Sequence, residues 1–178
     1  MRIFIACSSS NNIPKQYLTE SKDFLIQLFN KNHELIFGTS RNGILGLSYE
    51  IAKKYNCKIT AVYTPKQISD LRQLACNEEI IADSVVQRTQ QLISNSDIII
   101  FLPGGIGTFY ELISVIEMKR NGEINHPIII YNLNNYFDYL FSCFKKIFLN
   151  NFSSDEIESY CYITNQAKDI LDYINKLL

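Results

Sequence analysis

Short apolar runs alternate along the chain with longer segments in which apolar residues recur at helical spacing. The runs predict strands at residues 2–6, 34–37, 58–63, 79–81, 97–102, 127–131 and 160–163. The amphipathic segments predict helices at residues 14–30, 47–55, 84–94, 108–120, 136–148 and 166–178. Unbroken runs at 98–102 and 128–131 are typical of strands buried on both faces, as in parallel sheets. The alternation predicts an α/β fold, a doubly wound and mostly parallel sheet with helices on both faces.

Composition narrows the class of protein. A chain of 178 residues with 47% hydrophobic and 20% charged content fits one soluble domain over residues 1–178. The net charge of −1 gives no basis for binding nucleic acid or an anionic membrane, and no apolar run is long enough to span a bilayer. The opening MRIFIA turns polar too soon for a signal peptide. Five scattered cysteines and two histidines offer no zinc-like ligand set, so we expect a cytoplasmic protein with reduced thiols and no metal.

The stretch PGGIGTFYE at residues 103–111 carries the strongest chemical signal. It lies between a predicted strand and a predicted helix, and it contains three of the seven glycines of the chain. A glycine-rich turn that opens into a helix presents backbone N–H groups at the positive end of the helix dipole. Such a site suits an anion, above all a phosphate. The stretch is neither GxGxxG nor a P-loop, which disfavours nicotinamide and nucleoside triphosphate chemistry.

Thr108 and Glu111 also have the spacing of a capping box, which would give Glu111 a purely structural role. A capping box does not require the preceding glycines, however, and it leaves the N–H groups of the loop without partners. Both interpretations of Glu111 stay open on this pattern alone.

Two further loops follow predicted strands and are expected at the same edge of the sheet. They are CSSSN at residues 7–11 and GTSRNGILG at residues 38–46. Each alone is explained by a turn with a helix N-cap. Together, serine hydroxyls and glycine amides at adjacent strand ends favour a binding site for a sugar phosphate.

These residues resemble those of the LONELY GUY family, the cytokinin riboside 5′-monophosphate phosphoribohydrolases long mislabelled as lysine decarboxylases. The chain matches the family signature PGGxGTxxE at residues 103–111. It is also similar at the serine loop, at the glycine loop beginning with Gly38, and at Gln87-Arg88, where the family has QRK. The resemblance covers most of the chain.

The resemblance implies a Rossmann-like fold, a homodimer with its active site near the subunit interface, and no metal or cofactor. It implies hydrolysis of a nucleoside 5′-monophosphate, AMP or an N6-modified AMP, to a free base and ribose 5-phosphate. Arg88 and Glu111 stand at the positions of the catalytic pair. The expected substrate and phosphate ligands are Ser8, Ser9, Gly38, Gly43, Gly104, Gly105, Gly107 and Thr108.

The chain departs from the family pattern at several positions. Thr89 replaces a lysine, and Thr39 and Ser40 replace two glycines. Met118 and Arg120 replace a tryptophan and a glutamine, which we expect on the base side of the site. These changes bear on which base is released more than on nucleotide binding.

Other functions fit the same pattern. A non-catalytic nucleotide- or cofactor-binding or sensing protein could keep the phosphate loop, and a deoxyribosyltransferase-like enzyme would use a carboxylate as its nucleophile. Cys7 is a rival nucleophile at a strand end, although no histidine lies near it in the sequence to activate it. Apolar residues at 115–118 and on the helix 84–94 predict either a dimer face or core.

Overall fold

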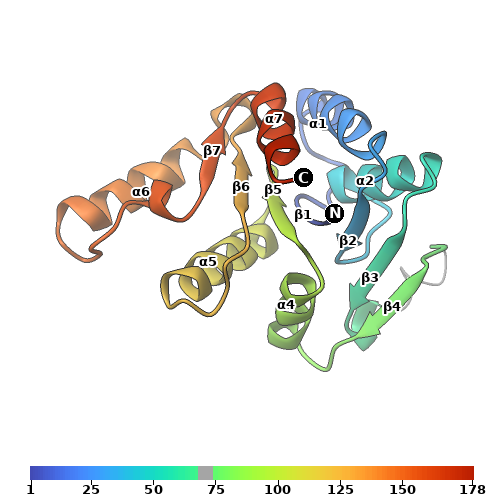
Figure 1. Ribbon diagram of the computed structural model, residues 1–178, viewed down its shortest axis with the longest axis horizontal. Helices are drawn as coiled ribbons and strands as arrows, with labels where there is room; N and C mark the ends of the chain where they lie inside the picture. The colour runs from blue at the N-terminus through green and yellow to red at the C-terminus, as the bar shows by residue number, and fades with distance from the viewer. Residues whose placement is uncertain (68–73) are drawn as a thin grey trace.

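A seven-stranded sheet runs through the centre of the computed structural model, which describes residues 1–67 and 74–178 (Figure 1). Its strands are β1 (Arg2–Ala6), β2 (Glu34–Phe37), β3 (Ile59–Tyr63), β4 (Glu78–Ile81), β5 (Ile98–Phe101), β6 (Ile128–Tyr131) and β7 (Tyr162–Thr164). The strand order is β4-β3-β2-β1-β5-β6-β7, and every neighbouring pair is parallel. The order reverses between β1 and β5, and such a switch point is where α/β sheets bind ligands.

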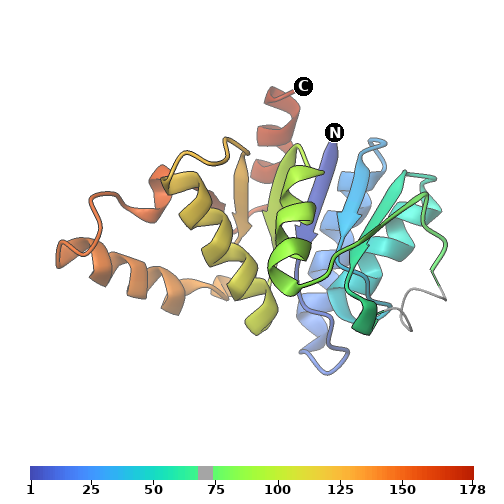
Figure 2. The same ribbon diagram turned by 90° about the horizontal axis from the view of Figure 1, so that it is seen from below.

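Helices cover both faces of this sheet (Figures 1 and 2). The described helices are α1 (Lys15–Phe29), α2 (Gly43–Lys54), α4 (Val85–Ser94), α5 (Ile106–Arg120), α6 (Asp138–Leu149) and α7 (Ala167–Lys176). Helices α1, α2 and α7 lie on one face, and α4 and α5 lie on the other (Figure 1). Short 3₁₀ turns occupy Pro65–Gln67, Leu133–Asn135 and Ile157–Ser159. The prediction of a doubly wound parallel α/β fold is confirmed.

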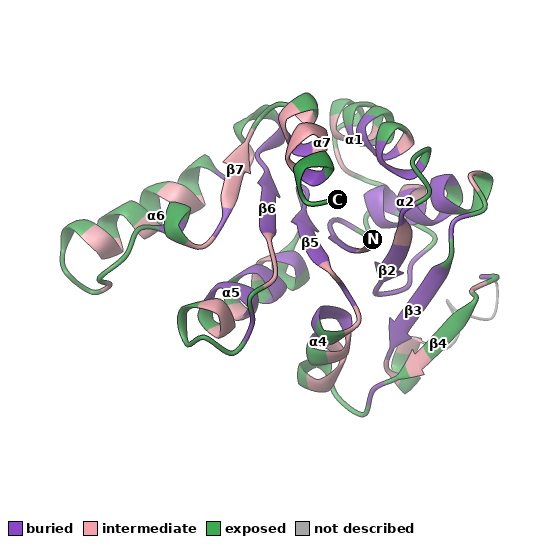
Figure 3. Cartoon of the chain, viewed as in Figure 1, coloured by how far each residue is buried: buried purple, intermediate pink, exposed green. Residues whose placement is uncertain are grey.

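The apolar core divides into two parts, one on each face of the sheet. Alternate residues of β1 point to opposite faces, so Ile3 and Ile5 join the cluster under α1 and α2 while Phe4 joins the cluster under α4 and α5. Strands β1, β2, β3, β5 and β6 are buried almost throughout (Figure 3). Burial on both faces explains why these strands read as continuous apolar runs.

Two helices begin earlier than their hydrophobic pattern predicts. Helix α2 begins at Gly43 instead of residue 47, and α5 begins at Ile106 instead of residue 108. Both first turns lie in the glycine-bearing loops, which have little apolar periodicity to mark them. The early start of α5 makes Gly105 its N-cap, with no side-chain capping hydrogen bond. The capping-box interpretation of Thr108 and Glu111 is therefore wrong.

Helix α6 differs from the other helices because none of its residues is buried. It extends from one end of the molecule with its aromatic side chains partly exposed (Figures 1 and 3). Tyr139 on this helix is 92% exposed, and Phe152 in the following loop is 84% exposed. Among the described residues, no helix is long and apolar enough to cross a membrane.

Candidate functional site

Three loops meet where the central strands end, and backbone hydrogen bonds tie them together. The Ser8 N–H donates to Pro103 O at 3.0 Å, which joins the loop after β1 to the loop after β5. The Leu45 N–H donates to Ser8 O at 3.1 Å, which joins the first loop to α2. The Ser8 hydroxyl oxygen accepts the Ser10 N–H at 3.1 Å and holds the serine loop in a turn. The predicted convergence of the three loops is present in the structure.

Helix α4 delivers Arg88 to this edge of the sheet. The hydroxyl of its N-cap, Ser84, accepts the Gln87 N–H at 3.2 Å, which fixes the start of the helix one turn before Arg88. The Arg88 guanidinium lies across the ends of β2 and β3. Its Nε donates to Val62 O at 3.2 Å, and its Nη2 donates to Gly38 O at 2.8 Å. Its Nη1 lies 3.3 Å from Glu111 Oε1.

Glu111 faces Arg88 from the second turn of α5, in a nearly closed environment. The exposed fraction of the Glu111 side chain is 11%, and that of Arg88 is 14%. Burial raises the pKa of Glu111 from 4.5 to about 7, because it outweighs the attraction of Arg88, which acts to lower it. A carboxyl group with a pKa near neutrality changes protonation state at physiological pH, as a general acid or base must.

Arg88 and Glu111 share one cavity of about 330 Å³ with most of the predicted ligands. Ser8, Ser9, Gly38, Gly105, Gly107 and Thr108 all line it. Gly105, Gly107 and Thr108 lie at the N-terminus of α5, where the first N–H groups have no acceptor within the helix. A phosphate-sized anion and a carboxylate therefore have places in the same cavity, about one and a half turns apart on α5.

Two predicted ligands, Gly43 and Gly104, do not line this cavity. Gly43 has a φ of +62°, and its N–H donates to Asn11 Oδ1 at 2.8 Å. A Cβ on Gly43 would come within 2.5 Å of Ser8 O, so this glycine allows the serine loop to pack on α2. A Cβ on Gly104 would lie 2.1 Å from Thr108 Oγ1, and Gly104 O accepts the Tyr136 hydroxyl. Both glycines shape the loops that carry the cavity.

The cavity also contains residues that the sequence analysis did not propose as ligands, among them Ser10, Thr39, Leu45, Gln67 and Ile106. Thr39 has a φ of +53°, which is unusual for a β-branched residue, and its buried hydroxyl has no hydrogen-bond partner. Thr39 stands where the family has a glycine, a residue that adopts a positive φ freely, and this departure was the sign in the sequence of the strain. Cys7 also lines the cavity, but burial, with a smaller contribution from Glu111, raises its thiol pKa well above the ordinary value. Cys7 is therefore a poor nucleophile.

Of the departures from the family pattern, Thr39 lines this cavity, whereas Ser40, Thr89, Met118 and Arg120 do not. Thr89 is buried, and its hydroxyl donates to Val85 O at 3.1 Å within α4. Residues 115–118 were predicted to form either a dimer face or part of the core. Val115 and Ile116 are buried in the core, so the second interpretation holds for these two residues. Arg120 lies at the other end of α5, where it binds Glu117 through two contacts of 2.8 Å. Arg120 was expected on the base side of the substrate site, but within this chain it does not line the cavity that holds Arg88 and Glu111.

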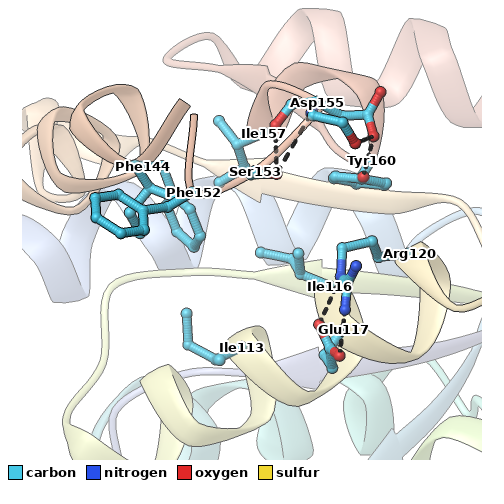
Figure 4. Close-up of a pocket in the computed structure, with 12 residues that line it drawn as sticks. Ile113, Ile116, Glu117, Arg120, Phe144, Phe152, Ser153, Asp155, Ile157 and Tyr160 are labelled. Atoms are coloured by element: carbon cyan, nitrogen blue, oxygen red, sulfur yellow. Dashed lines mark hydrogen bonds and ion pairs between the residues drawn. The ribbon is translucent and has the colours of Figure 1, made fainter. Parts of the chain in front are cut away.

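Arg120 instead borders a second hollow, of about 390 Å³, between α5 on one side and α6 with the segment that follows it on the other (Figure 4). Its lining is mostly apolar and includes Ile113, Ile116, Phe144, Phe152 and Ile157. Figure 4 shows the Arg120–Glu117 pair and the Tyr160–Asp155 hydrogen bond at its edge. Within residues 1–67 and 74–178, neither this hollow nor the rest of the surface groups three metal-ligating side chains.

Comparison with known sequences identifies the family of this chain. The model of a family described as "possible lysine decarboxylase" matches residues 44–174. The cytokinin riboside 5′-monophosphate phosphoribohydrolase LOG2 of Arabidopsis thaliana is 24% identical over 177 residues, covering 98% of this chain and 83% of the relative. The probable phosphoribohydrolase LOGL6 of Oryza sativa subsp. japonica is 26% identical over 175 residues, covering 96% of this chain and 69% of the relative.

Solved structures confirm the fold at lower sequence identity. A molybdenum cofactor carrier protein of Chlamydomonas reinhardtii superposes with a TM-score of 0.70 at 11% identity, covering 99% of this chain and 96% of the other. A molybdenum cofactor binding protein of Rippkaea orientalis gives 0.70 at 14% identity, with coverage of 99% and 96%. The family match spans most of the chain and includes both Arg88 and Glu111. The chain belongs to the "possible lysine decarboxylase" family, the family of the LONELY GUY proteins.

Proposed function

We propose that this protein hydrolyses the N-glycosidic bond of a nucleoside 5′-monophosphate and releases a free base and ribose 5-phosphate. AMP and N6-modified AMP of the cytokinin type are the substrates that we place first. The observation that carries the proposal is the buried Arg88–Glu111 pair, which shares its cavity with the N-terminus of α5. Relatives named as phosphoribohydrolases at about 24–26% identity support this class of reaction.

The N-terminus of α5 is the proposed site for the 5′-phosphate. N–H groups around Gly105, Gly107 and Thr108 would donate to the phosphate oxygens, and the helix dipole would stabilise their charge. Ser8 and Ser9, on the facing loop, would add hydroxyl donors. The phosphate would then fix the ribose with its C1′ atom toward Glu111.

Glu111 is the proposed catalytic carboxylate. Breaking the bond between C1′ and the base nitrogen builds positive charge on the ribose, and an ionised carboxylate nearby stabilises it. The oxygen of a water molecule bonds to C1′ as the C1′–N bond breaks. One proton of that water stays on the new C1′ hydroxyl, and the other ends on the departing base nitrogen. With a pKa near 7, Glu111 can accept the water proton or hold a ribose hydroxyl that orients the water. Arg88 would hold Glu111 in place and contact the phosphate or the base through its remaining N–H groups.

The first experiment is an HPLC assay of the purified protein against a panel of nucleoside 5′-monophosphates that includes AMP and isopentenyl-AMP. We expect release of free base together with ribose 5-phosphate, and loss of both in Glu111→Ala. A Glu111→Ala protein with normal turnover would contradict the catalytic assignment. Adding a free nucleobase as acceptor identifies a transferase, because a transferase would make a new nucleoside 5′-monophosphate instead of ribose 5-phosphate.

The same panel tests a non-catalytic alternative. The fold is shared with molybdenum cofactor carrier and binding proteins, although at 11–14% identity the likeness extends to the fold alone. Nucleotide binding by calorimetry without turnover of any compound would replace the hydrolase proposal with a carrier or sensing role.

We also propose that the protein is a homodimer, as the family resemblance implies. Large apolar side chains are exposed on the sheet face that α4 and α5 cover, among them Val85, Val86, Ile106 and Ile113. Apolar area of this kind is typical of a subunit interface. Light scattering during size-exclusion chromatography should give twice the chain mass, and Val86→Glu with Ile113→Glu should give the monomer mass. A monomeric wild-type chain at micromolar concentration would refute this proposal.

A further inference from the structure

The Arg88 guanidinium is held by the backbone ends of two strands in addition to its ion pair. Its Nε donates to Val62 O, its Nη2 donates to Gly38 O, and its Nη1 is left facing Glu111. Because the guanidinium is planar and rigid, two fixed nitrogens determine the direction of the third. The strand ends thereby set the geometry of the ion pair.

Gly38 makes this arrangement possible because it has no side chain. A Cβ at Gly38 would lie 1.6 Å from Arg88 Nη2 and 2.7 Å from Arg88 Cζ. Both distances are far below any van der Waals contact, so a side chain there displaces the guanidinium. Unlike Gly43, Gly38 does not have a positive φ, so the requirement is for space and not for backbone freedom.

Two glycines at the start of α5 provide a contrast. A Cβ at Gly105 or Gly107 would meet no atom within 4 Å. These two positions face open cavity, as expected where a ligand approaches the backbone. Gly38 instead faces an arginine that already fills the space.

We infer that Gly38 is a positioning residue, whose carbonyl and missing side chain hold Arg88 Nη1 against Glu111. This assigns Gly38 a role different from the phosphate contact expected from the sequence. The effect on Arg88 follows from the geometry alone, whereas its consequence for turnover rests on the proposed function.

A double-mutant cycle tests the inference through thermal stability, without using activity. Gly38→Ala should lower the melting temperature by about 5 °C, the range expected for overpacking in a protein of this size. In an Arg88→Ala background the same change should cost almost nothing, because the added methyl group occupies the space that the guanidinium has left. Gly107→Ala, the same chemical change at an open position of the same edge, should not lower the melting temperature. An equal loss from Gly38→Ala in both backgrounds would overturn the inference.

Two kinetic readouts separate positioning from phosphate binding. As a positioning residue, Gly38 should affect kcat, with a loss of about 100-fold in Gly38→Ala and no further loss when Arg88→Ala is already present. A phosphate ligand would instead raise KM in both backgrounds, which would contradict the inference. If the wild-type protein hydrolyses no nucleotide, the hydrolase proposal fails while the stability cycle still decides the role of Gly38. If Gly38→Ala does not fold, recovery of folding in the double variant supports the inference, and its failure to recover refutes it.

Discussion

Helix α5 takes part in an arginine–glutamate pair toward each end, Arg88–Glu111 near its start and Arg120–Glu117 near its finish. In the first pair the side chains are 14% and 11% exposed, and in the second they are 49% and 54% exposed. Burial raises the pKa of Glu111 to about 7. Hydrogen bonds from Arg120 and Asn121 lower the pKa of Glu117 to about 2. The same two residue types on one helix therefore behave in opposite ways, because only one pair has lost its water.

Backbone strain also differs between the site and the arm formed by α6. At the site, a positive φ falls on Thr39, a β-branched residue with an unpartnered hydroxyl. In the arm formed by α6 and the turn after it, a positive φ falls on Asn151, a residue type that tolerates this region. A strained backbone position and an unpartnered buried hydroxyl thus coincide at Thr39 in the cavity, and such strain is typical of functional sites. The following changes test whether this contrast is real.

The largest difference is expected from removing each glutamate in turn. Glu111→Gln should lower the rate of base release by about 10²–10⁴-fold, because a general base or charge-stabilising carboxylate contributes that much. Glu117→Gln should leave the rate unchanged, since its side chain is exposed and lies outside the cavity. HPLC measurement of kcat/KM for the two variants shows whether only Glu111 contributes to the reaction. Equal losses in both would remove the distinction between the pairs.

Removing each arginine should separate the pairs by stability. Arg88→Ala should lower the free energy of unfolding by about 3 kcal/mol at pH 8, because it removes the partner of the buried Glu111 carboxylate and the donor to Val62 O and Gly38 O. The loss should shrink at pH 5, where Glu111 is protonated. Arg120→Ala should have no measurable effect, as for most exposed ion pairs. Denaturant titrations at pH 5 and pH 8 would measure these losses in the free energy of unfolding. A loss from Arg88→Ala that is the same at both pH values would argue against a titrating Glu111.

The pH dependence of the reaction should follow Glu111. If the ionised carboxylate is the active form, kcat/KM should rise about tenfold per pH unit below 7 and level off above it. The free energy of unfolding should change in the opposite direction and fall as the pH rises. Because the pKa of Glu111 is raised above its ordinary 4.5, its contribution to stability is present below pH 4.5 and is lost as the pH rises through 7. Glu117→Gln should keep the wild-type rate profile, and a flat wild-type profile between pH 5 and 8 would contradict the assignment.

The smallest effect is expected from relieving strain at Thr39. Thr39→Gly should stabilise the protein by about 1 kcal/mol, because glycine adopts a positive φ without steric cost and removes the unpartnered hydroxyl. Asn151→Gly is the matched control in the arm, at a φ of +58°, where a smaller gain is expected. Melting temperatures of the two variants make the comparison. A destabilised Thr39→Gly would mean that packing of the threonine side chain outweighs the strain.

Much of the fold was predictable because burial requires a recognisable pattern of apolar residues along the chain. Central strands such as IIIF at β5 are covered on both faces and must be apolar throughout, so their bounds can be read within a residue or two. The helix starts at Gly43 and Ile106 were missed because glycine-rich first turns have no apolar face. The same turns carry the binding loops, so these two errors fall at the site.

Local periodicity and short motifs were enough to predict the doubly wound sheet and the three loops at its edge, and the family resemblance pointed to the pair Arg88 and Glu111. The surroundings of that pair follow from the folded chain alone. That Arg88 spans the ends of β2 and β3, that Gly38 leaves space for it, and that Glu111 loses its water are consequences of contacts between residues 23 to 50 positions apart. Dielectric environment and close packing are properties of the assembled core and have no local signature in the chain.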